Sequence, residues 1–195
     1  MTRTAAVARG QVWVAANVPY NQGVCHADIN GTYREDCSGF VSMAWHLSQS
    51  YTTYQFDPGS SGFLGITQPI AWSDLLPGDA LVINSSSQAH IVLFTGWIDS
   101  THYGIAEESR TGVGTIAYPD PAHGRAAVSI YDPYWSQYQP IRYNDIVADS
   151  SPTGASGWAA FDAGQFHLVE PDAAGHMQHT YYTSGWGTGP LGGTL

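Results

Sequence analysis

The sequence contains no lysine, and its 6 basic residues, all arginines, stand against 16 acidic residues for a net charge of −10. Such a chain cannot neutralise a run of phosphates, so we expect no nucleic-acid partner. No basic cluster that would bind an anionic membrane surface is present. No apolar run is long enough to span a bilayer, so we expect no membrane span. Low charge combined with many Gly, Ser, Thr, Tyr and Trp residues is typical of a secreted, β-rich protein.

The first ten residues contain Arg3 and Arg9 but lack the apolar stretch of a signal peptide. If the protein is exported, we therefore expect another export route or a signal peptide that has been removed.

The length of 195 residues corresponds to one domain, or to one domain with a small appendage. Apolar spacing predicts a helix over residues 4–17 and a second helix from Cys37 to about Ser50, and residues 51–70 have the composition of a loop. Short apolar runs between turns then predict strands over residues 80–83, 90–94 and 103–107, with further pairing from 113–118 and 127–131. Helices followed by an antiparallel sheet indicate an α+β domain.

A linker-like composition at residues 149–154 divides the chain. We expect one domain over residues 1–149 and a small β-rich extension over residues 150–195. The extension alternates aromatic, glycine and polar residues, and residues 175–182 with Trp186 resemble one degenerate blade of tachylectin- or fucolectin-like β-propellers. A single blade cannot bury its own faces, so it must pack on the first domain, assemble with copies of itself or belong to a longer array. Its aromatic side chains would form the core of the blade or contact carbohydrate.

The extension contains several residues of the types that bind zinc. His176 and His179, with His167, Glu170 or Asp172 nearby, offer zinc-binding groups. In a strand, however, residues three apart point to opposite faces. We therefore expect no metal and no cofactor.

A cysteine opens the second predicted helix, in the segment Asp36–Phe40. In the first turn of a helix, unpaired N–H groups and the positive end of the helix dipole favour the thiolate form. A thiolate is the reactive form, so Cys37 is a candidate nucleophile. The alternative is that Cys37 is a small buried hydrophobic residue.

A cysteine nucleophile needs a base, and the base needs a group that orients it. His90 begins a predicted strand and supplies the imidazole. Glu107 and Glu108 follow on the next strand and must point to opposite faces, so only one of them can face His90. We favour Glu107, with Glu108 and His102 as alternatives.

These residues resemble the pattern of the NlpC-type cell-wall cysteine peptidases, a papain-like family. The family pattern is an early Pro-Tyr, an Asp-Cys-Ser-Gly-Phe segment that opens a helix, and Leu-x-Pro-Gly-Asp before a strand. A histidine that begins the next strand and a polar residue on the following strand complete it. This chain has, in that order, Pro19-Tyr20, Asp36–Phe40, Leu75–Asp79, His90 and Glu107, and the resemblance covers roughly residues 5–148.

The resemblance implies a papain-like fold in which N-terminal helices pack on an antiparallel sheet. It implies that Cys37 is the nucleophile, that His90 is the general base and later the general acid, and that Glu107 orients His90. The family more often has His, Asn or Gln at the third position. A carboxylate is also suitable there, since it stabilises the imidazolium.

The resemblance also implies three residues that bind the substrate. Tyr20 would lie beside the thiolate and stabilise the oxyanion together with the backbone N–H of Cys37. Asp36 and Ser38 correspond to the positions that bind the free amino group of a stem peptide.

The segment Asn21–Arg34 departs from the family pattern. It lacks the Trp-Gly-Gly that commonly follows Pro-Tyr and carries Cys25 and His26 instead. Cys25 is either a free thiol or one half of a reversible disulfide with Cys37.

The function that the resemblance implies is an endopeptidase that cleaves an amide bond of peptidoglycan stem peptides through a thioester acyl-enzyme. The bond would be the one between γ-D-glutamyl and diaminopimelate or Lys, and the protein would be secreted or associated with the cell wall. One alternative is an amidase or acyltransferase of the same papain-like group. Another is a glycan-binding module on a catalytically inactive scaffold.

Overall fold

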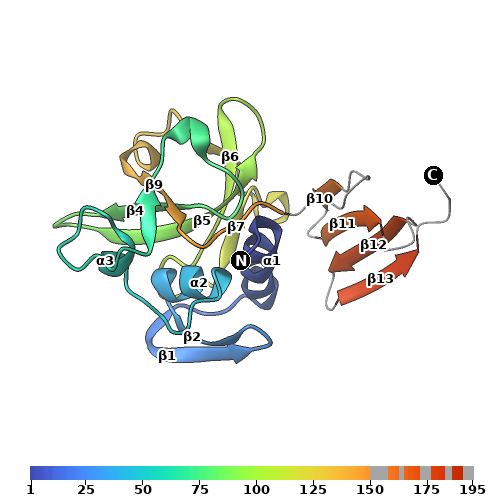
Figure 1. Cartoon of the computed structure of the whole chain (residues 1–195), viewed down its shortest axis with the longest axis horizontal. Helices are drawn as coiled ribbons and strands as arrows, with labels where there is room; N and C mark the ends of the chain where they lie inside the picture. The colour runs from blue at the N-terminus through green and yellow to red at the C-terminus, as the bar shows by residue number, and fades with distance from the viewer. Residues whose placement is uncertain (150–157, 163–164, 172–176, 183–185, 191–195) are drawn as a thin grey trace. The chain divides into compact units, whose positions relative to one another are not determined.

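The computed structural model describes residues 1–149 and four strands beyond them, over residues 158–162, 165–171, 177–182 and 186–190 (Figure 1). The chain forms two compact units, Met1–Ala148 and Asp149–Leu195. Within the described part of the chain, every helix is too short or too polar to cross a bilayer.

Helix α1 (Arg3–Ala16) begins after Thr2, whose hydroxyl accepts a hydrogen bond from the backbone N–H of Ala5 at 3.3 Å. Its buried face, which includes Ala6 and Trp13, packs against helix α2 and the sheet. The predicted helix over residues 4–17 is therefore present.

Strands β1 (Asn21–Asp28) and β2 (Gly31–Glu35) form an antiparallel hairpin between α1 and α2 (Figure 1). These two strands were not predicted, because the residues of β1 lack apolar alternation, and most of this strand is exposed. The turn is Ile29-Asn30, and Gly31, the first residue of β2, adopts a φ of 119°, which favours glycine.

Helix α2 (Cys37–Ala44) is buried along its whole length. It ends well before Ser50, where the sequence placed its end. His46 takes a left-handed φ of 54°, and the backbone N–H groups of His46 and Leu47 bond the carbonyls of Met43 and Ser42. This pair of bonds is a Schellman cap. The sequence did not indicate this end of α2, because the residue in the left-handed conformation is histidine rather than glycine.

The segment expected to be a loop, residues 51–70, contains a short helix, α3 (Thr53–Phe56), and a strand, β3 (Thr67–Pro69). The capping box of α3 pairs Thr52 with Gln55, a signal that was available in the sequence.

The sheet of the first unit has seven strands in the order β3-β9-β4-β5-β6-β7, with β8 paired to β6, and every pair is antiparallel. This arrangement confirms the α+β class. The bounds of the remaining strands are β4 (Ala80–Asn84), β5 (Ala89–Trp97), β6 (His102–Glu107), β7 (Ile116–Tyr118), β8 (Val128–Ser129) and β9 (Gln139–Tyr143). Three 3-10 turns, η1 (Trp72–Asp74), η2 (Pro121–His123) and η3 (Trp135–Gln137), connect strands.

The sheet separates two hydrophobic cores. On one face, alternate residues such as Ile91, Leu93 and Ala106 pack with the helices. On the other face, Val92 and Ile105 pack with the segments around η1 and η3. The period of two along each strand assigns each side chain to one of these cores.

In the second unit, β10 (Trp158–Asp162), β11 (Gln165–Pro171), β12 (Met177–Tyr182) and β13 (Trp186–Pro190) form a four-stranded antiparallel sheet with consecutive neighbours. The extension is therefore rich in β-structure. Its resemblance to a propeller blade stays a prediction. Of the zinc-binding candidates, His176 and Asp172 lie outside the described residues.

Candidate active site

Cys37 is the first residue of α2, and 7% of its surface is exposed. Asp36 caps the helix, because its carboxylate accepts a hydrogen bond of 2.7 Å from the backbone N–H of Gly39. A Cβ on Gly39 would lie 1.9 Å from the carbonyl oxygen of Arg34, so only glycine fits beside the incoming strand. The hydroxyl Oγ1 of Thr53 lies 3.9 Å from the Cys37 sulfur. The thiol thus stands at the N-terminus of α2, beside the carboxylate that caps the helix.

His90 lies near the start of β5, and Glu107 ends the neighbouring strand β6. His90 Nε2 is 2.7 Å from Glu107 Oε2, and both side chains are buried. His90 also lies close enough to Cys37 for the two side chains to interact, and the contact with Glu107 leaves Nδ1 of the ring free. The structure therefore brings a thiol, an imidazole and a carboxylate together in one chain of contacts.

The electrostatics of His90 favour its protonated form. Burial lowers the pKa of the imidazole, but hydrogen bonds with Cys37 and Glu107, and the charges of both groups, outweigh burial and raise the pKa of His90 to about 9. His90 therefore carries its proton at neutral pH. An imidazolium beside a thiol favours the thiolate, so the pair is suited to nucleophilic attack followed by proton donation.

The two alternatives to Glu107 lie elsewhere. His102 is partly exposed at the start of β6, where its Nδ1 bonds Thr101 Oγ1 at 2.9 Å and Asp99 at 3.1 Å. Glu108 is fully buried, and neither of its carboxylate oxygens has a hydrogen-bond partner among the described residues. Of these two neighbouring residues only Glu107 contacts the imidazole of His90, as expected from the alternation of side chains along a strand.

Glu108 is a neutral acid near the thiol. Burial, and after it the negative charges of Asp36, Glu35 and Cys37, raise its pKa to about 9. A protonated carboxyl at neutral pH avoids adding a fourth negative charge to this cluster.

Tyr20 lies half-buried close to the thiol. Burial raises the pKa of its hydroxyl, and the charges of Cys37 and Asp36 act in the same direction. Gln22 Nε2 donates a hydrogen bond of 2.8 Å to the Tyr20 oxygen. Since this bond occupies a lone pair, the hydroxyl proton stays available for an acceptor such as an oxyanion. Gln22 was not singled out from the sequence, because it lies in the segment that departs from the family pattern.

Asp36 and Ser38, which we expected to bind a substrate amine, are held by Arg34. The Arg34 guanidinium donates from Nε and Nη2 to the two oxygens of Asp36, and from Nη2 to Ser38 Oγ at 2.9 Å. Ser38 Oγ in turn donates to Asp36 Oδ1 at 3.1 Å. Arg34 was also not identified from the sequence, and its position directly before the Glu35-Asp36-Cys37 run was the available signal.

An aromatic cluster on the η3 segment flanks His90. The ring of Tyr138 packs edge-on against the imidazole, with centroids 6.3 Å apart. The Tyr138 hydroxyl lies 2.8 Å from that of Tyr134, and Gln88 Nε2 donates to both. The cluster was missed because these residues are far apart in sequence. It closes one side of the imidazole against water.

Cys25 and Cys37 are both free thiols, and Cys25 is exposed on β1. In the hairpin register Cys25 stands opposite Arg34. The neighbouring His26 places Nδ1 3.8 Å from Glu35 Oε1.

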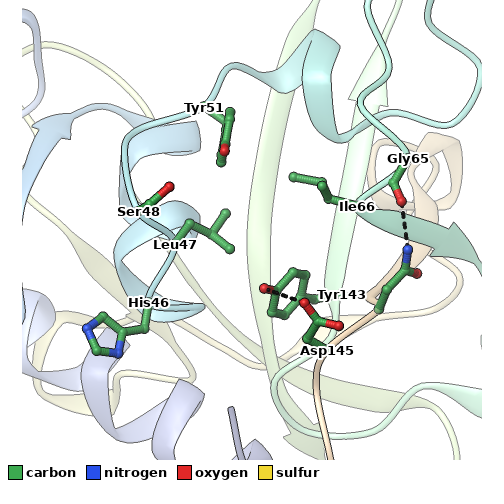
Figure 2. A pocket seen from close by; sticks show the side chains of 9 residues that line it. His46, Leu47, Ser48, Tyr51, Gly65, Ile66, Tyr143 and Asp145 are labelled. Atoms are coloured by element: carbon green, nitrogen blue, oxygen red, sulfur yellow. Dashed lines mark hydrogen bonds between the residues drawn. The ribbon is translucent and has the colours of Figure 1, made fainter.

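A separate hollow of about 440 Å³ lies at the other end of α2 (Figure 2). Tyr51, Ile66 and Tyr143 form its apolar walls, and the Tyr143 hydroxyl donates to Asp145 at 3.1 Å. Its lining lacks all three residues of the thiol–imidazole–carboxylate chain, so it is a different place on the surface. Within the part of the chain that the structure describes, no three His, Cys, Asp or Glu side chains cluster as a metal site requires.

No family model matches this chain, and no curated protein matches it. Two solved structures are similar in fold: the resuscitation promoting factor interacting protein RipA mutated at H432, and Rv1477, a hypothetical invasion protein of Mycobacterium tuberculosis. They are 17% and 18% identical to this chain, each with a TM-score of 0.41 over 72% of it. The chain spans 61% of the length of each. At this TM-score the likeness carries no conclusion about activity.

Proposed function

We propose that the first unit is a papain-like cysteine peptidase of the NlpC type that hydrolyses an amide bond in peptidoglycan stem peptides. The observation that carries the proposal is the contact chain from Cys37 through His90 to Glu107 at the N-terminus of a buried helix. The order of the motifs along the sequence supports the family. The scissile bond would join γ-D-glutamyl to diaminopimelate or Lys.

In the proposed reaction, the Cys37 thiolate attacks the carbonyl carbon of the scissile amide and forms a carbon–sulfur bond. The negative charge moves to the carbonyl oxygen, which the Cys37 backbone N–H and the Tyr20 hydroxyl stabilise. His90 then gives its proton to the departing amine as the carbon–nitrogen bond breaks, and a thioester remains.

The second half of the proposed reaction uses the neutral imidazole. His90 takes a proton from water, the resulting hydroxide attacks the thioester carbonyl, and Cys37 leaves as a thiolate. Glu107 keeps the ring oriented throughout and stabilises its protonated form. The acid is released and the initial state is restored.

A defined muropeptide tests the proposal. Wild-type protein should release two peptide fragments, and Cys37→Ala should release none. The matched control is Cys25→Ser, which removes the exposed thiol and should retain activity. Hydrolysis that persists in Cys37→Ala would contradict the proposal. Mass analysis of the products separates cleavage between amino acids from cleavage at the sugar and from acyl transfer.

We further propose that the protein acts outside the cell or at the cell wall, where its substrate lies. The second unit would then contact wall carbohydrate through its aromatic residues. Binding of purified glycan strands to the full chain, compared with binding to a chain that ends at Ala148, measures this contribution.

A further inference from the structure

The proposed reaction assigns no role to Arg34. Besides its bonds to Asp36 and Ser38, Nη2 donates to the backbone carbonyl of Tyr51 at 2.9 Å. The guanidinium is thus fixed between β2, the start of α2 and the chain that leads into α3. Ordered in this way, it loses little further entropy when it binds another group.

The Arg34 contacts engage the acceptors beside it. The Asp36 carboxylate accepts from Arg34 on both oxygens, and its Oδ1 also accepts from Ser38 and from the Gly39 backbone N–H. Ser38 Oγ both donates and accepts. An incoming ammonium would therefore compete with Arg34 for Asp36 and Ser38.

Arg34 itself keeps donors in reserve. In the described part of the chain, Nη1 has no hydrogen-bond partner, and 24% of the side chain is exposed. The guanidinium also lies close enough to Cys37 for their charges to interact. A partly exposed guanidinium with a pair of unused N–H donors thus lies near the candidate nucleophile.

Four of the other five arginines have partners of their own, and the fifth, Arg110, is exposed. Arg3 and Arg142 bind Asp79, and Arg125 binds Asp120. Arg9 donates to backbone carbonyls, including that of Met43 at 2.8 Å. Among the described contacts, then, Arg34 is the arginine that offers unused donors beside the thiol.

The acidic residues around Arg34 do not bind its Nη1. Asp36 engages the Nε and Nη2 edge of the guanidinium. Glu35 faces His26, with 3.8 Å between Oε1 and Nδ1. Glu108 is protonated at neutral pH, since its pKa is raised to about 9 by burial and by the acidic neighbours.

We propose that Nη1 of Arg34 binds a carboxylate that the substrate carries next to the scissile amide. The inference rests on the proposed function and names a group that the substrate must present. In a γ-linked glutamyl residue the scissile carbonyl belongs to the side chain, so the free α-carboxylate remains a short methylene chain away. Arg34 would bind that carboxylate and position the carbonyl over Cys37, and a free amino group at the peptide N-terminus would not be required.

Two synthetic stem peptides test this, identical except that the γ-linked glutamyl residue carries an α-carboxylate in one and an α-carboxamide in the other. A charge-assisted hydrogen bond corresponds to a preference of about 10- to 100-fold in kcat/KM for the carboxylate peptide. The difference should appear mainly in KM. Acetylating the N-terminal amine of the carboxylate peptide should change kcat/KM little.

Variants assign the preference to the residue. Arg34→Gln should abolish the preference between the two peptides, and Arg34→Lys, which keeps a charge without the planar fork, should retain part of it. The matched control is Arg110→Gln, which removes an exposed arginine and should keep the wild-type ratio. Melting curves of each variant check folding, and the wild-type ratio remains informative if Arg34→Gln is unstable.

The outcomes are distinct. Wild-type protein that cleaves both peptides equally well, or an Arg34→Gln variant that keeps the wild-type ratio, would overturn the Arg34 proposal and leave the proposed function standing. Failure of wild-type protein to cleave either peptide would count against the proposed function and the Arg34 proposal together.

Discussion

Replacing Glu107 by glutamine tests the electrostatic coupling of the site. Glutamine keeps the length of the side chain and can still accept a hydrogen bond from His90, but it removes the negative charge. Losing a charge-assisted hydrogen bond costs about 1.5–3 kcal/mol, and since one pKa unit corresponds to about 1.4 kcal/mol, the pKa of His90 should fall by about 1–2 units.

The fall in the His90 pKa has a defined effect on the pH profile. Proton donation to the leaving amine requires protonated His90, so the proposed activity of the wild type should decline as pH rises through about 9. In Glu107→Gln this alkaline limb should move to about pH 7–8. The loss at neutral pH should therefore be larger than the loss at pH 6.

The same shift affects stability. The folded-state pKa of His90 is raised from 6.5 to about 9, so the stabilisation from its protonation is complete below pH 6.5 and is lost as pH rises through 9. The variant should lose part of this stabilisation, and wild type and variant should converge above pH 9.

The assay is kcat/KM between pH 5 and pH 10 on one peptide, with thermal melts at the same pH values and both proteins in a Cys25→Ser background. An alkaline limb that stays in place in Glu107→Gln, or a wild-type limb near 6.5, would refute the coupling of His90 with Glu107. The macroscopic values belong to the coupled site, so the comparison rests on the shift between the two proteins.

Two further changes probe neighbouring residues. Tyr20→Phe removes one proposed oxyanion donor, and kcat should fall about 100-fold with little change in KM; an increase in KM alone would assign Tyr20 to substrate binding instead. Folding raises the pKa of Glu108 from 4.5 to about 9, so the folded protein loses stability as pH rises from 4.5 to about 9. Glu108→Gln removes this ionisable group and should therefore stabilise the protein by up to about 3 kcal/mol at pH 7, measured by denaturant unfolding. A wild type that gains stability relative to Glu108→Gln over this pH range would contradict the buried neutral acid.

The sequence allowed the α+β class and the principal elements of the first unit to be predicted, because apolar periodicity reports local structure. The structure around Cys37 could be predicted because the capping residue, the glycine and the apolar face of its helix all lie close together in sequence. The relation of His90 to Glu107 followed from two consecutive strands. In each case the signal lies within one element or between sequence neighbours.

The features that were missed depend on tertiary contacts or on unusual local chemistry. The Tyr138 ring reaches His90 from a distant segment, and the end of α2 relies on a left-handed histidine. The orientation of Arg34 depends on Tyr51, which lies on the far side of α2 in sequence. The resemblance assigned Asp36 and Ser38 to substrate binding but gave no sign of Arg34, which the structure shows donating to both.

The central claim is that Cys37 attacks the substrate and carries the acyl group. Rapid acid quenching of wild-type protein with a stem peptide, followed by digestion and mass spectrometry, tests it directly. We predict an acyl adduct on the peptide that contains Cys37, formed before the second product appears and absent from Cys37→Ala. Turnover without an adduct on that peptide, or with an adduct on Cys25, would contradict the account.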